Sequence, residues 1–547
     1  MTQYSFIDRD QAPWLHCPLD CSLTSGRQPT AAADFSLKRS CGTLRPGIPP
    51  TNARFATMRM TPSNPVCRPA ARIVAAGVLA AALAGCASMA PRLEVPAPPV
   101  AATWNDAGEA GQPAATLAWR DYFTDPQLRQ LIDTALANNR DLRIAMLRVE
   151  EAGAAFRIQR AGQFPAPGLA GQGARARVPG NLNASGVSAV GAEYRAEIGL
   201  TSWEVDLWGR VRSLKESALQ QWLATEEGRR AAELSLVAQV ADGYLGLREL
   251  DERVALAQRT LATRQESLRI FTRRYQVGSA SKLEQTQVQS LLSQAQALHA
   301  QLEQARATQR HALGQLVGAD LGPLPAAASF DDTMVLAELS PGLPSEVLLR
   351  RPDIIASEHQ LRAANANIGA ARAAFFPRIA LTGSVGSASA ALDGLFDGGS
   401  RAWSFAPVLS LPIFDGGQRR ANLELSIVRR DIAVANYEKS VQVAFREVAD
   451  ALSARRWLRE RRDVLQVGHD TAGERARLAK LRYDNGSATY LEVLDAQREL
   501  LDAGQQLVQA RRALLSSQVE LYRALGGSSA SRLPRIPPFP DRHGSRH

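Results

Sequence analysis

Residues 274–284 read RYQVGSASKLE and residues 482–492 read RYDNGSATYLE, so two stretches far apart in the chain are near copies of each other. The offset between them is 208, and the same offset pairs Gly209 with Gly417. Upstream of Gly209 the matching offset is 212. Because self-similarity at a fixed spacing indicates repeated structural units, the sequence predicts an internal tandem duplication. The two repeats are expected at 125–330 and 331–526.

Each copy contains a long stretch without proline, one between Pro179 and Pro323 and the other between Pro412 and Pro534. Proline breaks helix interiors, and both stretches are rich in residues that favour helix. A single Gly-Ser pair interrupts each stretch, and glycine is the usual residue at a tight turn between helices. The sequence therefore predicts long helical hairpins at about 209–318 and about 417–526, with tip turns at Gly278 and Gly486.

The helical stretches also carry a regular apolar pattern. Leu494, Leu501 and Val508 recur every seven residues, a spacing that is typical of coiled-coil packing. A continuous helix from Arg210 to Tyr275 would be roughly 100 Å long, which makes each hairpin a rod. An ordinary helical bundle would show a similar apolar pattern, so this alternative stays open.

A different pattern precedes each predicted helical hairpin. Apolar and polar residues alternate over 194–206, 378–386 and 402–414, and this period of two indicates β-strands. With the stretch around 171–178 as a further strand, the sequence predicts one two-stranded β-hairpin in each copy, at about 165–206 and about 376–414. A half-buried soluble sheet is one interpretation. If these are membrane strands, several chains must share one barrel, because an open sheet edge cannot sit in lipid.

The region before Cys86 has the features of a secretory signal. An apolar run of about ten residues follows several arginines, and it is too short to span a bilayer. Its last residues, Leu83-Ala84-Gly85-Cys86, resemble the bacterial lipobox. That resemblance implies cleavage before Cys86 and lipid attachment to it, and Ala87 favours sorting to the outer membrane. A chance match in an Ala-rich stretch is the alternative.

The remaining segments are interpreted from their composition. Residues 1–57 are polar, Pro-rich and without pattern, and we interpret them as a disordered gene-start artefact, since secretory signals begin close to the N-terminus. The true start would then be Met58 or Met60. We expect a lipoprotein signal peptide at 58–85, a lipidated extended segment at 86–124, and a flexible tail at 527–547.

Composition excludes several classes of function. The net charge of +10 is unevenly placed, because residues 1–85 carry +5 and the remaining 462 residues another +5. No basic stripe is interleaved with aromatics, so no nucleic-acid partner is expected. All five cysteines lie within the first 86 residues, which excludes a thiol nucleophile or a cysteine metal site in the main body. We find no convergent acid, base, nucleophile and metal set, so an enzyme is the least favoured class. No metal and no cofactor is expected, apart from a covalent lipid on Cys86.

Several local stretches between Trp119 and Gly526 resemble one known family. They are WRDYFTDP at 119–126, AANANIGAAR at 363–372, FFPR at 375–378 and YLEVLDAQR at 490–498. The chain resembles the TolC-like outer membrane factors of Gram-negative tripartite efflux and secretion systems. It is most similar to the lipoprotein branch that serves RND-type multidrug pumps.

The resemblance implies a mainly α fold with a small β part, assembled as a homotrimer. Three copies of four strands would form a 12-stranded transmembrane β-barrel in the outer membrane, and the long helices an α-helical coiled-coil barrel through the periplasm. The shorter helices that complete the tunnel wall would lie at 125–161 and 344–374. The implied partners are a periplasmic adaptor protein, an inner-membrane RND-type pump and outer membrane lipid.

The resemblance also implies a periplasmic gate at the hairpin tips. By matching position, the gate acids are Glu492 and Asp495, and three-fold symmetry would make each a ring of three carboxylates. Tyr483 matches a tyrosine that tethers the tip to an acid of the first copy, which is Glu284 here. The alternative is that both acids simply lie on a solvated helix start, where they favour the helix dipole.

One position departs from the family pattern. Some members place an arginine after the second-copy turn, and it bonds the first copy. Here that position is Ala488, and the matching acceptor position is Leu283. The closing network is therefore expected to be thinner or differently built.

The function that the resemblance implies is passive conduction of drugs or other small molecules through an exit duct of an efflux pump. The outer membrane exit channel of a type I protein secretion system is one alternative. A pore-less periplasmic scaffold lipoprotein is another, although the alternating strands argue against it.

Overall fold

The computed structural model describes residues 89–97, 112–113, 117–323, 339–340 and 350–527. All of them belong to one compact unit, Ala71–His547. The segments predicted as a gene-start artefact (1–57) and a signal peptide (58–85) lie outside the described residues. So do Cys86, residues 344–349 of the second predicted short-helix region, and the predicted tail beyond Gly527.

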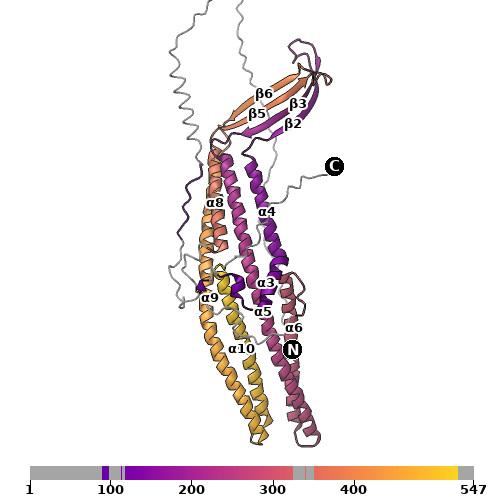
Figure 1. Cartoon of the computed structure of the whole chain (residues 1–547), viewed down its shortest axis with the longest axis vertical. Coiled ribbons are helices and arrows are strands. Elements are labelled where there is room, and N and C mark those ends of the chain that lie inside the picture. Colours follow the sequence, from indigo (N-terminus) through magenta and orange to yellow (C-terminus); the bar gives the residue numbers. More distant parts are fainter. Residues whose placement is uncertain (1–88, 98–111, 114–116, 324–338, 341–349, 528–547) are drawn as a thin grey trace, which may run out of the picture. The chain divides into compact units, whose positions relative to one another are not determined.

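Helices form most of the described structure (Figure 1). The first copy contains α3 (Pro126–Asn138), α4 (Arg140–Ala161), α5 (Arg210–Gln276) and α6 (Lys282–Val317). The second copy contains α8 (Pro352–Ala373), α9 (Gln418–Asp484) and α10 (Tyr490–Ala524). Helices α5 and α9 have 67 residues each, so each is roughly 100 Å long. They start 208 residues apart, and α4 and α8 start 212 residues apart, as in the sequence repeat.

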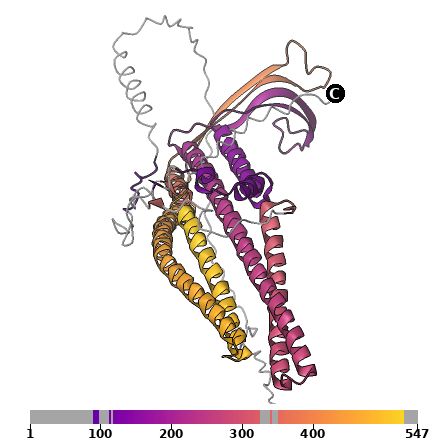
Figure 2. The same cartoon turned by 60° about the horizontal axis from the view of Figure 1, so that its bottom comes forward.

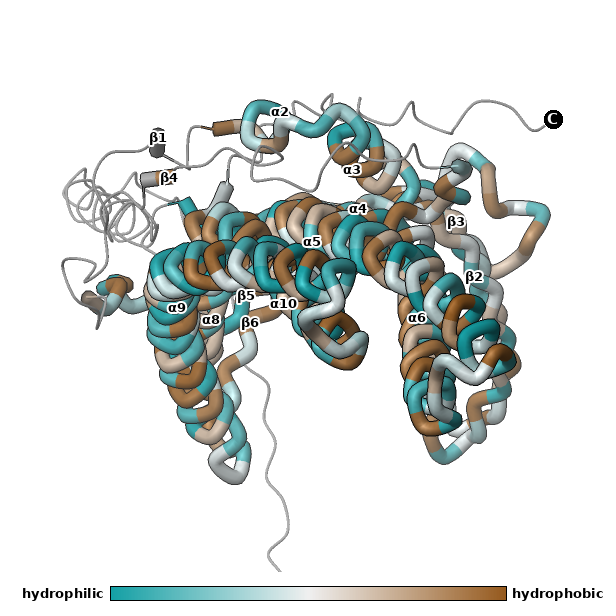
Figure 3. Tube along the Cα trace, turned by 90° about the horizontal axis from the view of Figure 1, so that it is seen from below, coloured by the Kyte–Doolittle hydropathy of each residue, from teal (hydrophilic) through white to brown (hydrophobic). Residues whose placement is uncertain are grey.

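Helix α5 is the centre of the helical part. It packs against α3, α4, α6, α8 and α10, while α9 packs against α8 and α10. The first hairpin (α5 and α6) therefore lies beside the second hairpin (α9 and α10), with α10 next to α5 (Figure 3). Within the described residues, no helix is both long enough and apolar enough to cross a membrane.

In the main apolar core, stacked aromatic rings join the segment before the first copy to the second copy. Tyr122 stacks on Tyr522 of α10 with 4.5 Å between ring centroids, and its hydroxyl donates to the Gln518 carbonyl at 2.9 Å. Tyr244 of α5 donates to the Asp125 carboxylate at 2.7 Å. The same carboxylate caps α3, because it also accepts from the first backbone N–H groups of that helix. One side chain thus stabilises both a helix start and the packing of that helix on α5.

The segment predicted as extended, 86–124, is only partly so. Residues Met89–Ala97 have no helix or strand, but Trp119–Tyr122 form a short helix, α2. The prediction of an extended chain is wrong there. A helical turn places Trp119 and Tyr122 three residues apart on one face, and the structure buries both.

The four predicted strands form one antiparallel sheet, in the order β2, β3, β5, β6. Their bounds are β2 Pro167–Val178, β3 Ala189–Glu204, β5 Arg378–Ser389 and β6 Arg401–Ser410. The sheet is curved (Figure 2), and the β3–β5 pair joins the two copies. In the described structure β2 and β6 each pair on one side only. The predicted fold class, mainly α with a small β part, is confirmed.

The greater length of strand β3 contributes to the change of offset between the copies. It has 16 residues, whereas its counterpart β6 has 10. Its register against β5 shifts between Leu200 and Trp203, and Ser202 there has a φ of 52°. This irregularity is a β-bulge, which absorbs extra residues while the rest of the strand stays paired. A second, two-residue parallel pair, β1 (Gln112–Pro113) with β4 (Leu339–Ser340), was not predicted.

Gly318 ends α6 at a point where another helix comes very close. Its φ is 71°, and a Cβ atom there would lie 2.7 Å from the Asn138 carbonyl oxygen. We expect Gly318→Ala to lower the free energy of unfolding by about 1–3 kcal/mol more than Gly322→Ala, because of this overlap. Gly322 is the matched control, since its φ is 57° but a Cβ there would meet nothing within 4 Å. Denaturant unfolding of both variants, followed by circular dichroism, checks this, and equal losses would contradict it.

Candidate functional site: the tips of the helical hairpins

Both hairpins turn through the same hydrogen-bonded motif. At the end of α5 the Gly278 N–H donates to the Tyr275 carbonyl and the Ser279 N–H donates to the Arg274 carbonyl. The end of α9 repeats this pattern at Gly486 and its neighbours. Gly278 and Gly486 have φ values of 75° and 71°, a left-handed conformation that favours glycine. The two glycines predicted as tip turns therefore lie where the helices end.

A small apolar cluster joins the two tips. Phe271 of α5 and Val288 of α6 are buried against Leu494 of α10. The Phe271 ring also packs on Tyr490 at the start of α10, with 4.6 Å between centroids. Tyr490 in turn makes an edge contact of 4.9 Å with Tyr483 at the end of α9. The cluster draws on four helices, so its packing holds the first hairpin against the second.

Polar contacts run alongside this cluster. Arg274 Nη1 donates to the Tyr483 hydroxyl at 2.6 Å, and the hydroxyls of Ser267 and Tyr490 lie 2.5 Å apart. Arg264 Nη1 donates to Gln497 Oε1 at 3.0 Å. All three contacts pair α5 with a residue of the second hairpin. On α5 the three residues are separated by about one helical turn and then about two, at roughly 5 Å per turn. This row of contacts is called the ladder.

Arg264 is the buried cation of the ladder, with 3% of the residue exposed. Its second nitrogen donates to the Leu494 carbonyl at 3.3 Å, so both of its described acceptors are neutral. Burial lowers the pKa of the Arg264 guanidinium, because a charged group loses hydration there. A buried cation held by neutral acceptors favours one register of α5 against α10.

The two predicted gate acids are paired with arginines. Glu492 forms an ion pair with Arg482 at the end of α9. Asp495 accepts from Arg475 at 3.1 Å and from Arg498 at 2.6 Å. The pairs with Arg482 and Arg475 connect α9 with α10, whereas the Asp495–Arg498 pair lies within α10. The charge of both acids is therefore locally balanced.

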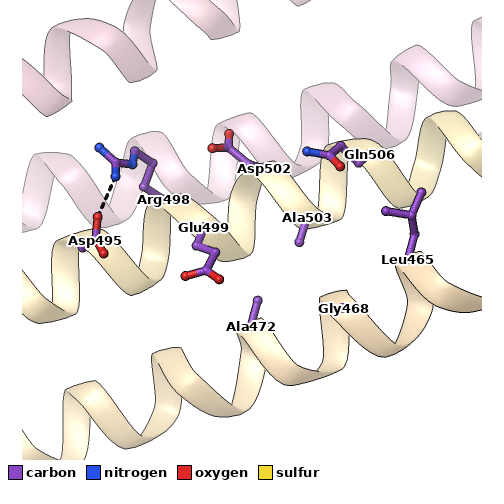
Figure 4. A pocket seen from close by; sticks show the side chains of 9 residues that line it. All are labelled: Leu465, Gly468, Ala472, Asp495, Arg498, Glu499, Asp502, Ala503 and Gln506. Atoms are coloured by element: carbon purple, nitrogen blue, oxygen red, sulfur yellow. Dashed lines mark hydrogen bonds and ion pairs between the residues drawn. The ribbon is translucent and has the colours of Figure 1, made fainter.

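Asp495 and Arg498 also line a hollow of about 420 Å³ between α9 and α10 (Figure 4). The wall on the α10 side is strongly polar and includes Glu499, Asp502 and Gln506. On the α9 side the lining residues are Leu465, Gly468 and Ala472, which are apolar or small. One wall of the hollow is therefore charged, and the other consists of apolar or small residues.

The predicted tether between Tyr483 and Glu284 is wrong in this structure. The Tyr483 hydroxyl accepts from Arg274 instead. Glu284 is engaged at its own helix start, where it accepts from the Ser281 backbone N–H at 2.7 Å in a capping box. These bonds lower the pKa of the Glu284 carboxyl. The capping box holds the carboxylate at the first turn of α6, so it serves the helix end rather than the other tip.

An arginine of the first copy links the two tips in this structure, although Ala488 stands at the position of the family arginine. Arg274 reaches from α5 to Tyr483, so the cation that links the tips comes from the other hairpin. Leu283, at the acceptor position, is exposed. The expectation of a differently built network agrees with this arrangement.

Sequence reasoning missed Arg264, Ser267, Phe271 and Arg274. The repeat could have found Arg274, because it matches Arg482 at the 208 offset. Nothing in the sequence distinguishes Arg264 from the other arginines of α5, since only packing against α10 buries it. Within the described residues, no group of three or more His, Cys, Asp or Glu side chains could hold a metal ion.

Comparison with known proteins identifies the family. The model of the outer membrane efflux protein family matches residues 131–319 and 343–527. The chain belongs to this family. The predicted resemblance is confirmed, and the protein is an efflux channel of the outer membrane.

Individual relatives agree with this assignment. The outer membrane protein OprJ of Pseudomonas aeruginosa is 45% identical over 457 residues, covering 83% of this chain and 95% of the relative. The toluene efflux pump outer membrane protein TtgC of Pseudomonas putida is 43% identical over 467 residues, covering 83% and 95%. The open-state MtrE outer membrane channel of Neisseria gonorrhoeae is 39% identical, with a TM-score of 0.75, and covers 81% of this chain and 98% of that one.

Proposed function

We propose that this outer membrane efflux protein is the passive exit duct of a tripartite pump, working as a homotrimer. The observation that most supports this proposal is the four-stranded sheet, whose outer strands β2 and β6 each pair on one side only. A sheet in lipid must satisfy every backbone group. Three copies joined edge to edge would form twelve strands and leave no open edge. The long helices would then line a tunnel continuous with this barrel.

We infer that transport through this duct needs no chemistry by the protein itself. The relative TtgC is named as the outer membrane protein of an efflux pump, and energy would come from a pump in the inner membrane. A periplasmic adaptor would connect the two, and the exposed hairpin tips are the ends available to it. The name of TtgC specifies toluene, which favours small apolar molecules as cargo here.

We propose lipid attachment at Cys86 as the membrane anchor. The support is the lipobox resemblance of the residues that end in this cysteine. Acyl chains stabilise membrane attachment by about 0.8 kcal/mol per buried CH₂ group. No other cofactor is proposed.

The tips would act as the gate. In a trimer each tip would contribute Glu492 and Asp495, and the rings they form would carry their arginine partners with them. The arginine beside each acid would reduce the repulsion among the three carboxylates of a ring, because it balances their charge locally. Closure would then rest mainly on the packing of the cluster around Phe271, and the acids would set ion selectivity.

Removing the two gate carboxylates tests this assignment. In Glu492→Gln/Asp495→Asn the arginines remain, so we expect cation selectivity to fall and the single-channel conductance to rise. Planar-bilayer recordings in a salt gradient give both quantities. Glu266→Gln is the matched control, since Glu266 is an exposed acid paired with Arg269 on its own helix. Currents with unchanged selectivity would keep the duct and overturn the gate, and no current from inserted protein would favour a pore-less scaffold.

A further inference from the structure

The segment Met89–Pro91, called here the strap, is seated on one face of α8. Asn365 Nδ2 donates to the Pro91 carbonyl at 2.9 Å, and Arg372 Nη1 donates to the Met89 carbonyl at 3.3 Å. These two side chains lie seven residues apart, two turns along the same helix face. The strap therefore runs along α8 with its carbonyl groups held at both ends.

Gly369 makes this seat possible. It lies between Asn365 and Arg372, and a Cβ atom there would be 2.7 Å from the Ala90 backbone nitrogen. It would also be 2.8 Å from Ser213 Oγ of α5. The backbone of the strap thus passes through a notch that only glycine leaves open, so its position on α8 is specific.

An apolar hollow opens where the strap begins. It has a volume of about 480 Å³ and is lined by Met89, Arg372, Phe375, Phe376 and Leu423. The two phenylalanines are 40% and 41% exposed, so part of each ring is accessible from the hollow.

The hollow lies at the junction between the helices and the sheet. Phe376 stacks on Trp208 at 4.8 Å, and β5 begins two residues later, at Arg378. The Arg419 guanidinium lies 5.7 Å from the Phe375 ring centre. Aromatic and basic side chains are typical of the boundary between a membrane and water. The hollow is therefore at the level where acyl chains begin.

We propose that this hollow binds an acyl chain of the lipid carried by Cys86. Cys86 is three residues before Met89, and an extended chain of that length spans at most about 10 Å. The strap therefore places the modified cysteine within reach of the hollow, and Gly369 fixes the path of the strap along α8. The inference rests on the proposed lipidation, and it adds a defined protein site for the lipid.

Photo-cross-linking of the full-length protein in its membrane tests the site. Leu423 is replaced by the photoreactive residue p-benzoylphenylalanine, and cross-linked peptides are identified by mass spectrometry. We expect the position-423 peptide to be joined to the acylated Cys86 peptide. The same replacement at Val464, an exposed residue of α9, is expected to give no such product. Cross-links from position 423 only to phospholipid, or only to a neighbouring protomer, would overturn the proposal.

Variants of the α8 residues that hold the strap provide a second test. Gly369→Ala should displace the strap and lower the cross-link yield by on the order of tenfold. Gly468→Ala is the matched control, because a Cβ there meets nothing within 4 Å. Asn365→Ala removes only the hydrogen bond to Pro91 and serves if Gly369→Ala does not fold. An unchanged yield in the folded seat variants would overturn the role of the strap.

The mass of the N-terminal peptide distinguishes a failure of the proposed lipidation from a failure of the proposed acyl-chain site. An unmodified Cys86 would end the proposed lipidation, and this inference with it. An acylated Cys86 without the cross-link would end the inference about the hollow alone.

Discussion

Phe271→Ala is expected to loosen the hairpin tips and open the channel. Phe271 is buried between Val288 of its own hairpin and Leu494 and Tyr490 of the other. Removing a buried phenylalanine ring costs about 3–5 kcal/mol, including the cavity that it leaves. If this packing is made only when the tips are together, a loss of 3 kcal/mol shifts the closed-to-open ratio by about 100-fold.

Single-channel recording measures this shift directly. We expect long openings of large conductance in Phe271→Ala, compared with small steps in the unaltered protein. Tyr275→Ala is the matched control, since Tyr275 is one turn further along α5 but 42% exposed. A surface change of this kind is usually within about 0.5 kcal/mol. Equal conductance in both variants would show that the cluster does not hold the gate.

Tyr522→Ala is expected to lower the free energy of unfolding by about 3–5 kcal/mol. The Tyr522 ring is buried against Tyr122 at 4.5 Å and lies edge-on to Phe123 at 6.2 Å. Its hydroxyl donates to the Leu117 carbonyl at 3.0 Å. The substitution therefore removes the contact that fastens the segment around α2 to α10.

Tyr522→Phe separates the ring from the hydroxyl. It keeps the stack and loses one hydrogen bond, for which we expect about 1 kcal/mol. Denaturant unfolding in detergent, followed by circular dichroism, gives both values. A loss in Tyr522→Ala no larger than in Tyr522→Phe would show that the stacked rings contribute little.

Phe271 and Tyr522 lie in different parts of the helical structure. Phe271 lies in the cluster near the tips, whereas Tyr522 lies in the main core. We therefore expect Tyr522→Ala to reduce the amount of folded protein while the conductance of each folded channel stays unchanged. Phe271→Ala should change conductance itself.

The sequence by itself determined the repeat, the helical hairpins and the four strands. These follow from local physics: proline is absent from the interiors of the long helices, glycine stands at the tip turns where φ is positive, and apolar residues alternate in three of the strands. The tip glycines Gly278 and Gly486 could be identified for this reason, since a turn of this type is decided by a few adjacent residues. The family could also be identified from local stretches such as 490–498.

Only the tertiary structure decided which partner each side chain has. Tyr483 pairs with Arg274 rather than Glu284, because Glu284 is nearer to its own helix start than to the other hairpin. Arg264 is buried only because α10 lies against α5, and Gly369 is required only because the strap crosses α8. Such contacts join residues far apart in sequence, and no local pattern records them. They depend on the register of helices roughly 100 Å long, which packing along the whole interface sets.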